Sequence, residues 1–179
     1  IHLPEQAEPV SKVVDLIQIP AFLARQTDLL VAAAKTGLPI NIKKAQFLSP
    51  GDMIHAVKKV QHHSDAGVIL TERGTSFGYN NLVVDFRSIA QMKAFGTPVC
   101  FDATHATQQP GGHGKTSGGD REMAPLLARA AVAAGADLLF MEVHKNPQQA
   151  KSDAATQLPI DQLSELLEQL LRIKIAILP

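Results

Sequence analysis

Residues 67–73 read GVILTER, and they combine the two features that decide the fold. A short apolar run, GVIL, is followed directly by charged side chains. Four other runs of this kind occur at residues 13–19 (VVDLIQI), 39–42 (PINI), 98–101 (PVCF) and 136–141 (ADLLFM). Nearly continuous runs of Val, Ile and Leu are typical of strands that are buried on both faces.

Segments with helix signals separate these runs. Thr27 and Asp28 precede LLVAAAK, and Ser49 followed by Pro50 is a favourable start for the next helix. An Ala- and Leu-rich helix is expected over residues 121–134, and a last helix begins near Pro159. Its apolar stripe contains Leu163, Leu166, Leu167, Leu170 and Leu171. Alternating strands and helices predict a parallel sheet in one α/β domain, residues 1–179.

Composition excludes several classes of protein. Hydrophobic residues make up 45% and charged residues 19%, a balance that excludes a disordered chain. The 17 basic and 17 acidic residues cancel, so the overall charge gives no reason to expect a nucleic-acid or membrane partner. A lone cysteine, Cys100, cannot form an internal disulfide, and no apolar run approaches the ~20 residues of a membrane span. We therefore expect a cytoplasmic protein.

Polar groups lie at the C-terminal end of each of the five runs or shortly after it. These groups are Gln18, Lys43 and Lys44, Glu72 and Arg73, Asp102 and His105, and Glu142 and His144. The C-terminal ends of parallel strands meet at one edge of a sheet, so the pattern predicts an active face there. Both an α/β barrel and a doubly wound sheet place their sites in this way.

Two candidate sites stand out at this edge. Lys43 and Arg73 would bring two cations together, which favours an anionic ligand. The alternative is a structural ion pair of these cations with Glu72 or Asp102. One imidazole and two carboxylates, from His105, Glu142 and Asp153, could hold a divalent metal. A single histidine is otherwise more often a hydrogen-bonded core residue.

Residues 108–119, QQPGGHGKTSGG, contain five glycines. We interpret them as a lid over the site, with an ordinary flexible loop as the alternative. A phosphate-binding loop ending at Gly114, Lys115 and Thr116 is disfavoured, because that motif needs glycine where this chain has Gln109. Residues 74–85, GTSFGYNNLVVD, place Phe77 and Tyr79 in a strand-to-helix loop, for ligand contact or for packing against another subunit.

Several long motifs resemble one enzyme family over essentially the whole chain. They are IQIPAFLARQTDLL, INIKKAQFLSPGDM, LTERGTSFGYNNLVVDFRS, FDATHATQ, SGGDRE and FMEVHKNPQQAKSDAATQLP. They are similar to the 3-deoxy-D-manno-octulosonate 8-phosphate synthases, which are (β/α)8 TIM barrels. These enzymes condense phosphoenolpyruvate with arabinose 5-phosphate. Related synthases that use another sugar match the motifs less well.

The resemblance implies roles for matching positions. Gln18, Ala21, Lys43 and Arg73 correspond to the phosphoenolpyruvate pocket, and Phe22 and Arg25 to the path of arabinose 5-phosphate. His105, Glu142 and Asp153 match three ligands of the metal-dependent branch, in which His105 is also counted with Lys43 and Arg73 as catalytic. The implied metal is Fe²⁺ or Zn²⁺, with Mn²⁺ or Co²⁺ as substitutes, and the implied assembly is a homotetramer.

The chain departs from this family in length. A TIM barrel typically needs ~250 residues, and only five strands are expected here, roughly strands 4 to 8 with their helices. A family cysteine ligand and an Asn-Arg-Ser loop are absent. We expect the sequence to be part of a longer polypeptide, and a non-catalytic barrel fragment is the alternative to an enzyme.

Overall fold

A computed structural model describes residues 1–76, 80–111 and 118–178. Its centre is a parallel sheet of five strands in the order β1-β2-β3-β6-β9. The strands are β1 (Ile17–Ile19), β2 (Ile40–Lys43), β3 (Val68–Glu72), β6 (Val99–Asp102) and β9 (Leu138–Phe140). Each strand pairs with the next one along the chain, as the five apolar runs predict.

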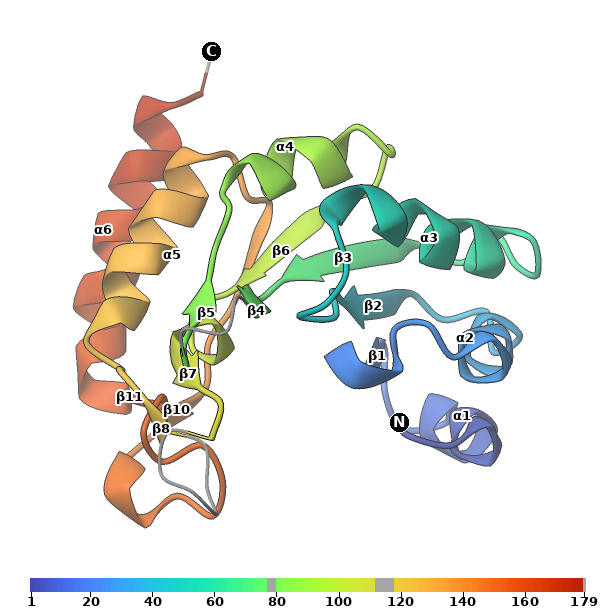
Figure 1. Ribbon diagram of the computed structural model, residues 1–179, viewed down its shortest axis with the longest axis horizontal. Helices are drawn as coiled ribbons and strands as arrows, with labels where there is room; N and C mark the ends of the chain where they lie inside the picture. The colour runs from blue at the N-terminus through green and yellow to red at the C-terminus, as the bar shows by residue number, and fades with distance from the viewer. Residues whose placement is uncertain (77–79, 112–117, 179) are drawn as a thin grey trace.

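Helices cover the convex side of this curved sheet (Figure 1). They are α2 (Thr27–Ala34), α3 (Met53–Gln61), α4 (Arg87–Lys93), α5 (Met123–Ala133) and α6 (Leu163–Ala176), with the short α1 (Ala7–Ser11) beyond α2. Ser49 accepts a hydrogen bond from the Asp52 amide and so caps the 3-10 turn Pro50–Asp52 that leads into α3. The apolar faces of these helices and of the sheet form one core.

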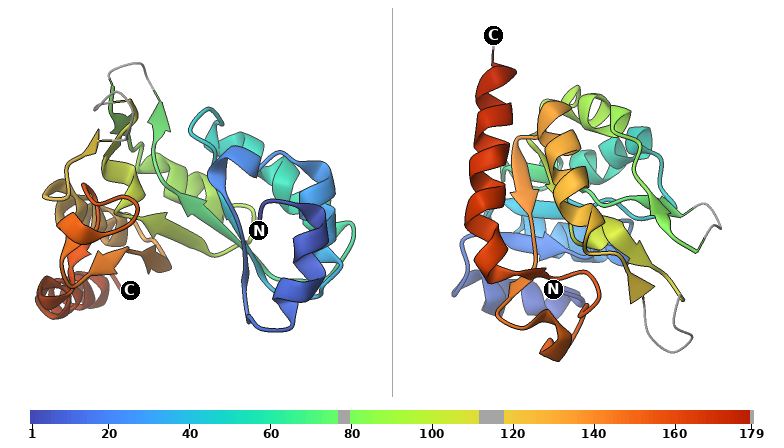
Figure 2. Two further views of the ribbon diagram at one scale, coloured as in Figure 1. Left: turned by 90° about the horizontal axis from the view of Figure 1, so that it is seen from below. Right: turned by 90° about the vertical axis from the view of Figure 1, so that its left-hand side faces the viewer.

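Short strand pairs lie at the carboxyl edge of the sheet, where the loops gather (Figure 2). Two are antiparallel: β4 (Thr75–Ser76) with β5 (Leu82–Val83), and β7 (Gln108–Gln109) with β8 (Gly118–Gly119). The third pair, β10 (Val143–His144) with β11 (Leu158–Pro159), is parallel. These pairs hold the loops that surround the site.

Two details of the sequence prediction are wrong. The first apolar run yields a strand only from Ile17, because the Ile17 amide is the first to bond across to β2, at Pro39 O. Val13, at the start of that run, is 81% exposed. The stripe of α6 is also only half buried: Leu166 and Leu170 pack into the core, whereas Leu167 and Leu171 face outward.

Candidate active site

One cavity of about 360 Å³ opens at the carboxyl edge of the sheet. We call it the central cavity. Its lining residues come from the ends of all five strands and from the loops that follow them: Gln18, Pro20, Ala21, Phe22, Lys43, Gln46, Arg73, His105, Gln108, Pro110, Phe140 and Glu142. Five of the predicted polar groups line this cavity together: Gln18, Lys43, Arg73, His105 and Glu142. The other four do not line it: Lys44, Glu72, Asp102 and His144.

Lys43 ends β2, and its side chain is almost fully buried. Its ammonium group pairs with the carboxylate of Asp102, the last residue of β6, and lies 3.9 Å from the centroid of the Phe140 ring. The ion pair with Asp102 that the sequence left open as an alternative is therefore present. Because Lys43 still lines the central cavity, this pairing also fixes the ammonium group at the cavity wall.

Arg73 follows β3 and is also buried. Its Nη2 atom donates a hydrogen bond to Gln108 Oε1 at 2.6 Å, while its buried Nη1 atom has no hydrogen-bond partner among residues 1–76, 80–111 and 118–178. Burial lowers the pKa of Arg73, and the nearby carboxylates of Asp102 and Glu72 act to raise it. An unsatisfied buried guanidinium at a cavity wall is suited to an anionic ligand.

Asp102 connects Lys43 to His105. Its Oδ1 atom accepts hydrogen bonds from the His105 amide and the Thr104 hydroxyl, and its Oδ2 atom lies 2.8 Å from His105 Nδ1. Burial acts to raise the pKa of Asp102, but His105 and Lys43 outweigh it and the pKa is lowered. Asp102 is therefore an anion that holds one nitrogen of His105 and leaves the other, Nε2, facing the cavity.

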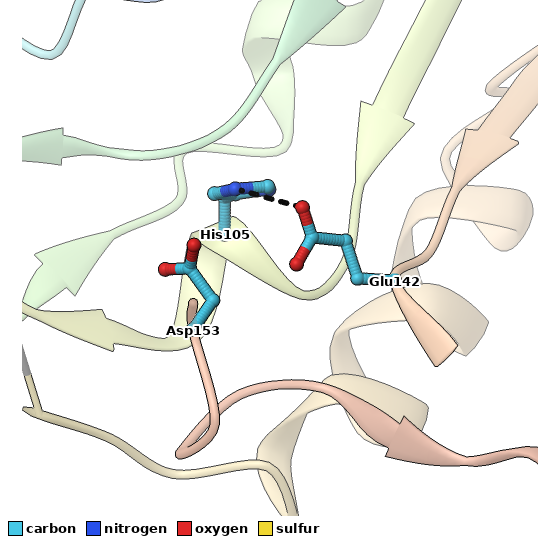
Figure 3. A group of neighbouring side chains, drawn as sticks. All are labelled: His105, Glu142 and Asp153. Carbon is cyan, nitrogen blue, oxygen red and sulfur yellow. Dashed lines mark ion pairs between the residues drawn. The ribbon is translucent and has the colours of Figure 1, made fainter. Parts of the chain in front are cut away.

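His105, Glu142 and Asp153 offer three ligand atoms that lie within 4.8 Å of one another (Figure 3). His105 Nε2 is 3.5 Å from Glu142 Oε1, and Glu142 Oε2 is buried without a partner in the described part of the chain. Bonds of 2.0–2.2 Å to an ion separate its ligands by roughly 3 to 4.4 Å. One nitrogen and two carboxylates at this spacing fit a divalent metal such as zinc or iron.

Asp153 reaches this cluster through an unusual backbone conformation. Its φ angle is +50°, which non-glycine residues seldom adopt, although Asp tolerates it better than most. The amides of Thr156 and Gln157 donate hydrogen bonds to its carbonyl oxygen and stabilise the turn. Gln108 Nε2 donates to Asp153 Oδ1 at 2.6 Å, so Gln108 contacts both Arg73 and Asp153.

Not every predicted residue lies at the central cavity. Arg25 lines a separate cavity of about 470 Å³ with His55 and Lys59, because the chain turns after the 3-10 helix Ala21–Leu23 and carries it toward α3. The proposed lid is described only at its ends, since residues 112–117, including Gly114, Lys115 and Thr116, lie outside the described residues. The same holds for Phe77 and Tyr79.

The sequence reasoning missed Gln108 as part of the site. The only signal in residues 108–119 is their glycine content. A glutamine amide adds no charge and no periodic pattern, so nothing in the sequence marks Gln108 as part of the site. Gln46, whose buried Oε1 atom also lacks a partner within the described residues, was missed for the same reason.

Residues 1–178 match the DAHP synthetase I family. The chain belongs to this family. Its α/β architecture, with a parallel sheet and outer helices, fits the TIM-barrel-like fold expected from the sequence.

Three similar curated proteins carry the name 2-dehydro-3-deoxyphosphooctonate aldolase. The Cyanothece protein is 59% identical over 99% of this chain and 65% of its own length. The Nitratidesulfovibrio vulgaris protein is 60% identical over 95% of this chain and 62% of its own length. The Desulfatibacillum aliphaticivorans protein is 55% identical over 97% and 64%, respectively. The chain therefore spans less than two thirds of the length of these relatives.

None of the helices in the described part of the chain combines the length and apolar character that a membrane crossing requires.

Proposed function

We propose that the protein containing this chain is a 3-deoxy-D-manno-octulosonate 8-phosphate synthase, the enzyme that the relatives' name denotes. It condenses phosphoenolpyruvate with arabinose 5-phosphate and water, giving the eight-carbon sugar-acid phosphate and inorganic phosphate. The observation that best supports this activity is the unsatisfied Arg73 guanidinium beside Lys43 in the cavity that His105 and Glu142 also line. In this proposal the chain supplies roughly strands 4 to 8 of a (β/α)8 barrel.

Lys43 and Arg73 would bind the phosphate and carboxylate of phosphoenolpyruvate, which stay charged throughout the reaction. Gln18 and Ala21 line the same cavity and would complete that pocket. C3 of phosphoenolpyruvate attacks the aldehyde carbon of the sugar, and a water oxygen adds to C2. The bond between C2 and the phosphate oxygen then breaks and releases phosphate. Lys43 and Arg73 hold the reacting molecule in place during these steps.

His105, Glu142 and Asp153 would hold Fe²⁺ or Zn²⁺, with Mn²⁺ or Co²⁺ as substitutes. When bound, such a metal polarises an aldehyde or a water molecule. His105 suits this role because Asp102 orients its ring and leaves Nε2 toward the two carboxylates. Each of the three side chains points into the cluster (Figure 3).

Phe22 lines the mouth of the central cavity and is 72% exposed, which suits contact with arabinose 5-phosphate. Arg25 does not line the central cavity of this chain, so its position gives no support for a contact with arabinose 5-phosphate. The separate cavity of Arg25 does contain two further basic side chains, His55 and Lys59.

We further propose a cytoplasmic homotetramer, to which the exposed Phe22 and Phe47 would contribute contacts. Light scattering of the intact protein tests the assembly.

An assay of the intact protein with both substrates tests the activity, by phosphate release and by product identity. Arg73→Lys, which loses the guanidinium fork, should lower kcat/KM for phosphoenolpyruvate about 10- to 100-fold. Arg87→Lys is the matched control, because Arg87 pairs with Asp85 on the exposed surface. No phosphate release from the wild-type protein would contradict the proposal. A better rate with another aldose would instead favour a related sugar-acid synthase.

A further inference from the structure

Lys43 and Lys44 are neighbours in the sequence, but their side chains have different surroundings. Lys43 lines the central cavity, whereas Lys44 does not and is 0% exposed. A fully buried ammonium group is rare unless it is paired and hydrogen-bonded. Because Lys44 is sealed from the cavity, it cannot touch a ligand there, and its burial calls for another explanation.

Lys44 Nζ lies at the junction of three segments. It is 3.5 Å from Glu72 Oε1, at the end of β3. It donates hydrogen bonds to Thr75 Oγ1 in β4 at 3.1 Å and to Leu48 O, in the loop after β2, at 3.3 Å. The ammonium group therefore ties the ends of β2 and β3 to the first strand of the β4–β5 hairpin.

Glu72 uses the same carboxylate oxygen to hold the backbone that follows it. Oε1 accepts hydrogen bonds from the Arg73 amide at 3.0 Å and from the Gly74 amide at 2.7 Å. Glu72 is itself 1% exposed, so these are buried contacts of an ion. Hydrogen bonds to a buried carboxylate are stronger than neutral ones, and they fix the turn from which the Arg73 side chain leaves.

Gly74 makes this turn specific. Its φ angle is +91°, and a Cβ atom at this position would lie 3.0 Å from Leu82 Cβ. The backbone therefore turns directly after Arg73 and lies against Leu82 of β5. Because the backbone of Arg73 is held in this way, only its side-chain torsions can change. The hydrogen bond to Gln108 restrains the guanidinium group as well.

We propose that Lys44 and Glu72 are positioning residues for Arg73. The buried ion pair fixes the Arg73–Gly74 turn so that the guanidinium presents Nη1, which has no hydrogen-bond partner among the described residues, to an anionic ligand in the central cavity. This inference rests on the proposed function, because the ligand considered is phosphoenolpyruvate. A merely structural pair would contribute to the stability of the fold and leave the affinity of the folded protein for that ligand unchanged.

Four variants of the intact protein separate these two roles. Glu72→Gln keeps the shape of the side chain but removes its charge. Lys44→Met with Glu72→Met replaces the whole pair by apolar side chains, which avoids an unpaired buried charge. Thr75→Val removes one hydroxyl contact of Lys44 and serves if the other two fail to fold, with Thr75→Ser as its conservative partner. Phosphoenolpyruvate binding is measured by calorimetry, and unfolding of each sample is measured in parallel.

Lys93 and Asp137 provide a matched control. Lys93 Nζ lies 2.7 Å from Asp137 Oδ1, and Asp137 Oδ2 accepts a hydrogen bond from the Val99 amide, so this pair also holds strand backbone. Val99 begins β6, so the pair lies at the opposite end of the strands from the central cavity. Lys93→Met with Asp137→Leu should lower the unfolding temperature and leave phosphoenolpyruvate affinity unchanged.

We expect the Glu72 variants to weaken phosphoenolpyruvate binding about tenfold and to raise its KM more than they lower kcat. Thr75→Val should weaken binding about threefold and Thr75→Ser less than Thr75→Val. Folded Glu72 variants or a folded Thr75→Val protein that bind within about twofold of the wild type would overturn the inference, as would an equal loss in the control pair. Failure of the wild-type protein itself to bind phosphoenolpyruvate would instead contradict the proposed function.

Discussion

His105 Nδ1 lies 2.8 Å from Oδ2 of the fully buried Asp102, and this contact aims the opposite ring nitrogen at Glu142. The same carboxylate pairs with Lys43. The buried Asp102 carboxylate thus holds both the Lys43 ammonium group, at the wall of the central cavity, and His105 of the candidate metal centre. The two halves of the site, which the sequence presents as separate patterns, share a single support.

Replacement of Asp102 by Asn should weaken metal binding. Asn keeps the size of the side chain but loses the charge that orients the His105 ring, and replacing the partner of a metal-ligating histidine in this way lowers metal affinity about 10- to 100-fold. Zinc affinity of the intact protein, measured by competition with a chelating dye, tests this outcome. Asp85→Asn, which changes an exposed carboxylate paired with Arg87, is the control and should bind zinc normally. Equal affinities for the two variants would contradict the role of Asp102.

Cys100 should make the fold less stable at alkaline pH. Burial raises the pKa of its thiol from 9.0 to about 11, so the unfolded chain releases the proton first as the pH rises. The stabilising contribution is therefore complete below about pH 9 and declines toward pH 11, by at most about 3 kcal/mol.

Urea unfolding of the wild type and of Cys100→Ala between about pH 8 and pH 11 measures this effect as a difference. The difference removes the opposite contribution of Lys44, whose pKa is lowered by burial. A gap between the two proteins that stays constant over this pH range would be inconsistent with the expected titration.

Gly119→Ala should disturb the pairing of β7 with β8. A Cβ atom at this position would lie 2.2 Å from Thr156 Cγ2, which is far inside van der Waals contact. We expect a loss of about 1–3 kcal/mol in unfolding free energy. Addition of Thr156→Ser, which removes the Cγ2 methyl group, should restore much of this loss. Gly51→Ala, with its nearest neighbour at 3.9 Å, is the control.

Two adjacent leucines of α6 should respond differently to truncation. Leu170 is 4% exposed and packs into the core, whereas Leu171 is 60% exposed. Leu170→Ala should lower the unfolding free energy by about 2–5 kcal/mol, and Leu171→Ala by less than about 0.5 kcal/mol. Denaturant unfolding of both variants provides the comparison. An equal loss in the intact protein would mean that another segment or subunit covers Leu171.

The strands were predictable because burial on both faces leaves a direct trace in the sequence. Residues 68–70 illustrate this, since Val68 and Leu70 are buried, Ile69 is half-buried and none of the three is exposed. Residues 13–16 show the limit of the argument. Val13 belongs to an apolar run, but strand pairing begins only at Ile17, where a partner is present in β2. Hydrophobicity predicts which residues are buried, whereas the position of the neighbouring strand decides where strand pairing begins.

The site was predictable to the extent that strand ends share one edge. Lys43, Arg73, His105 and Glu142 line a common cavity for that reason. Lys44 was grouped with these polar ends, but its side chain is buried in the Glu72 cluster instead. A sequence does not show which of two successive lysines faces the cavity when the strand ends between them. The position of Arg25, one turn beyond the site, depends on a 3-10 turn that has no comparable sequence signal.

Gln108 connects the candidate anion site to the candidate metal site. Its amide bonds to Arg73 on one side and to Asp153 on the other, so a ligand that displaces it from either neighbour changes the surroundings of the second. Thermodynamic linkage requires this influence to be mutual. Under the proposed function, titrations with phosphoenolpyruvate and with metal therefore follow two linked equilibria, and each apparent affinity should be stated with the concentration of the other ligand.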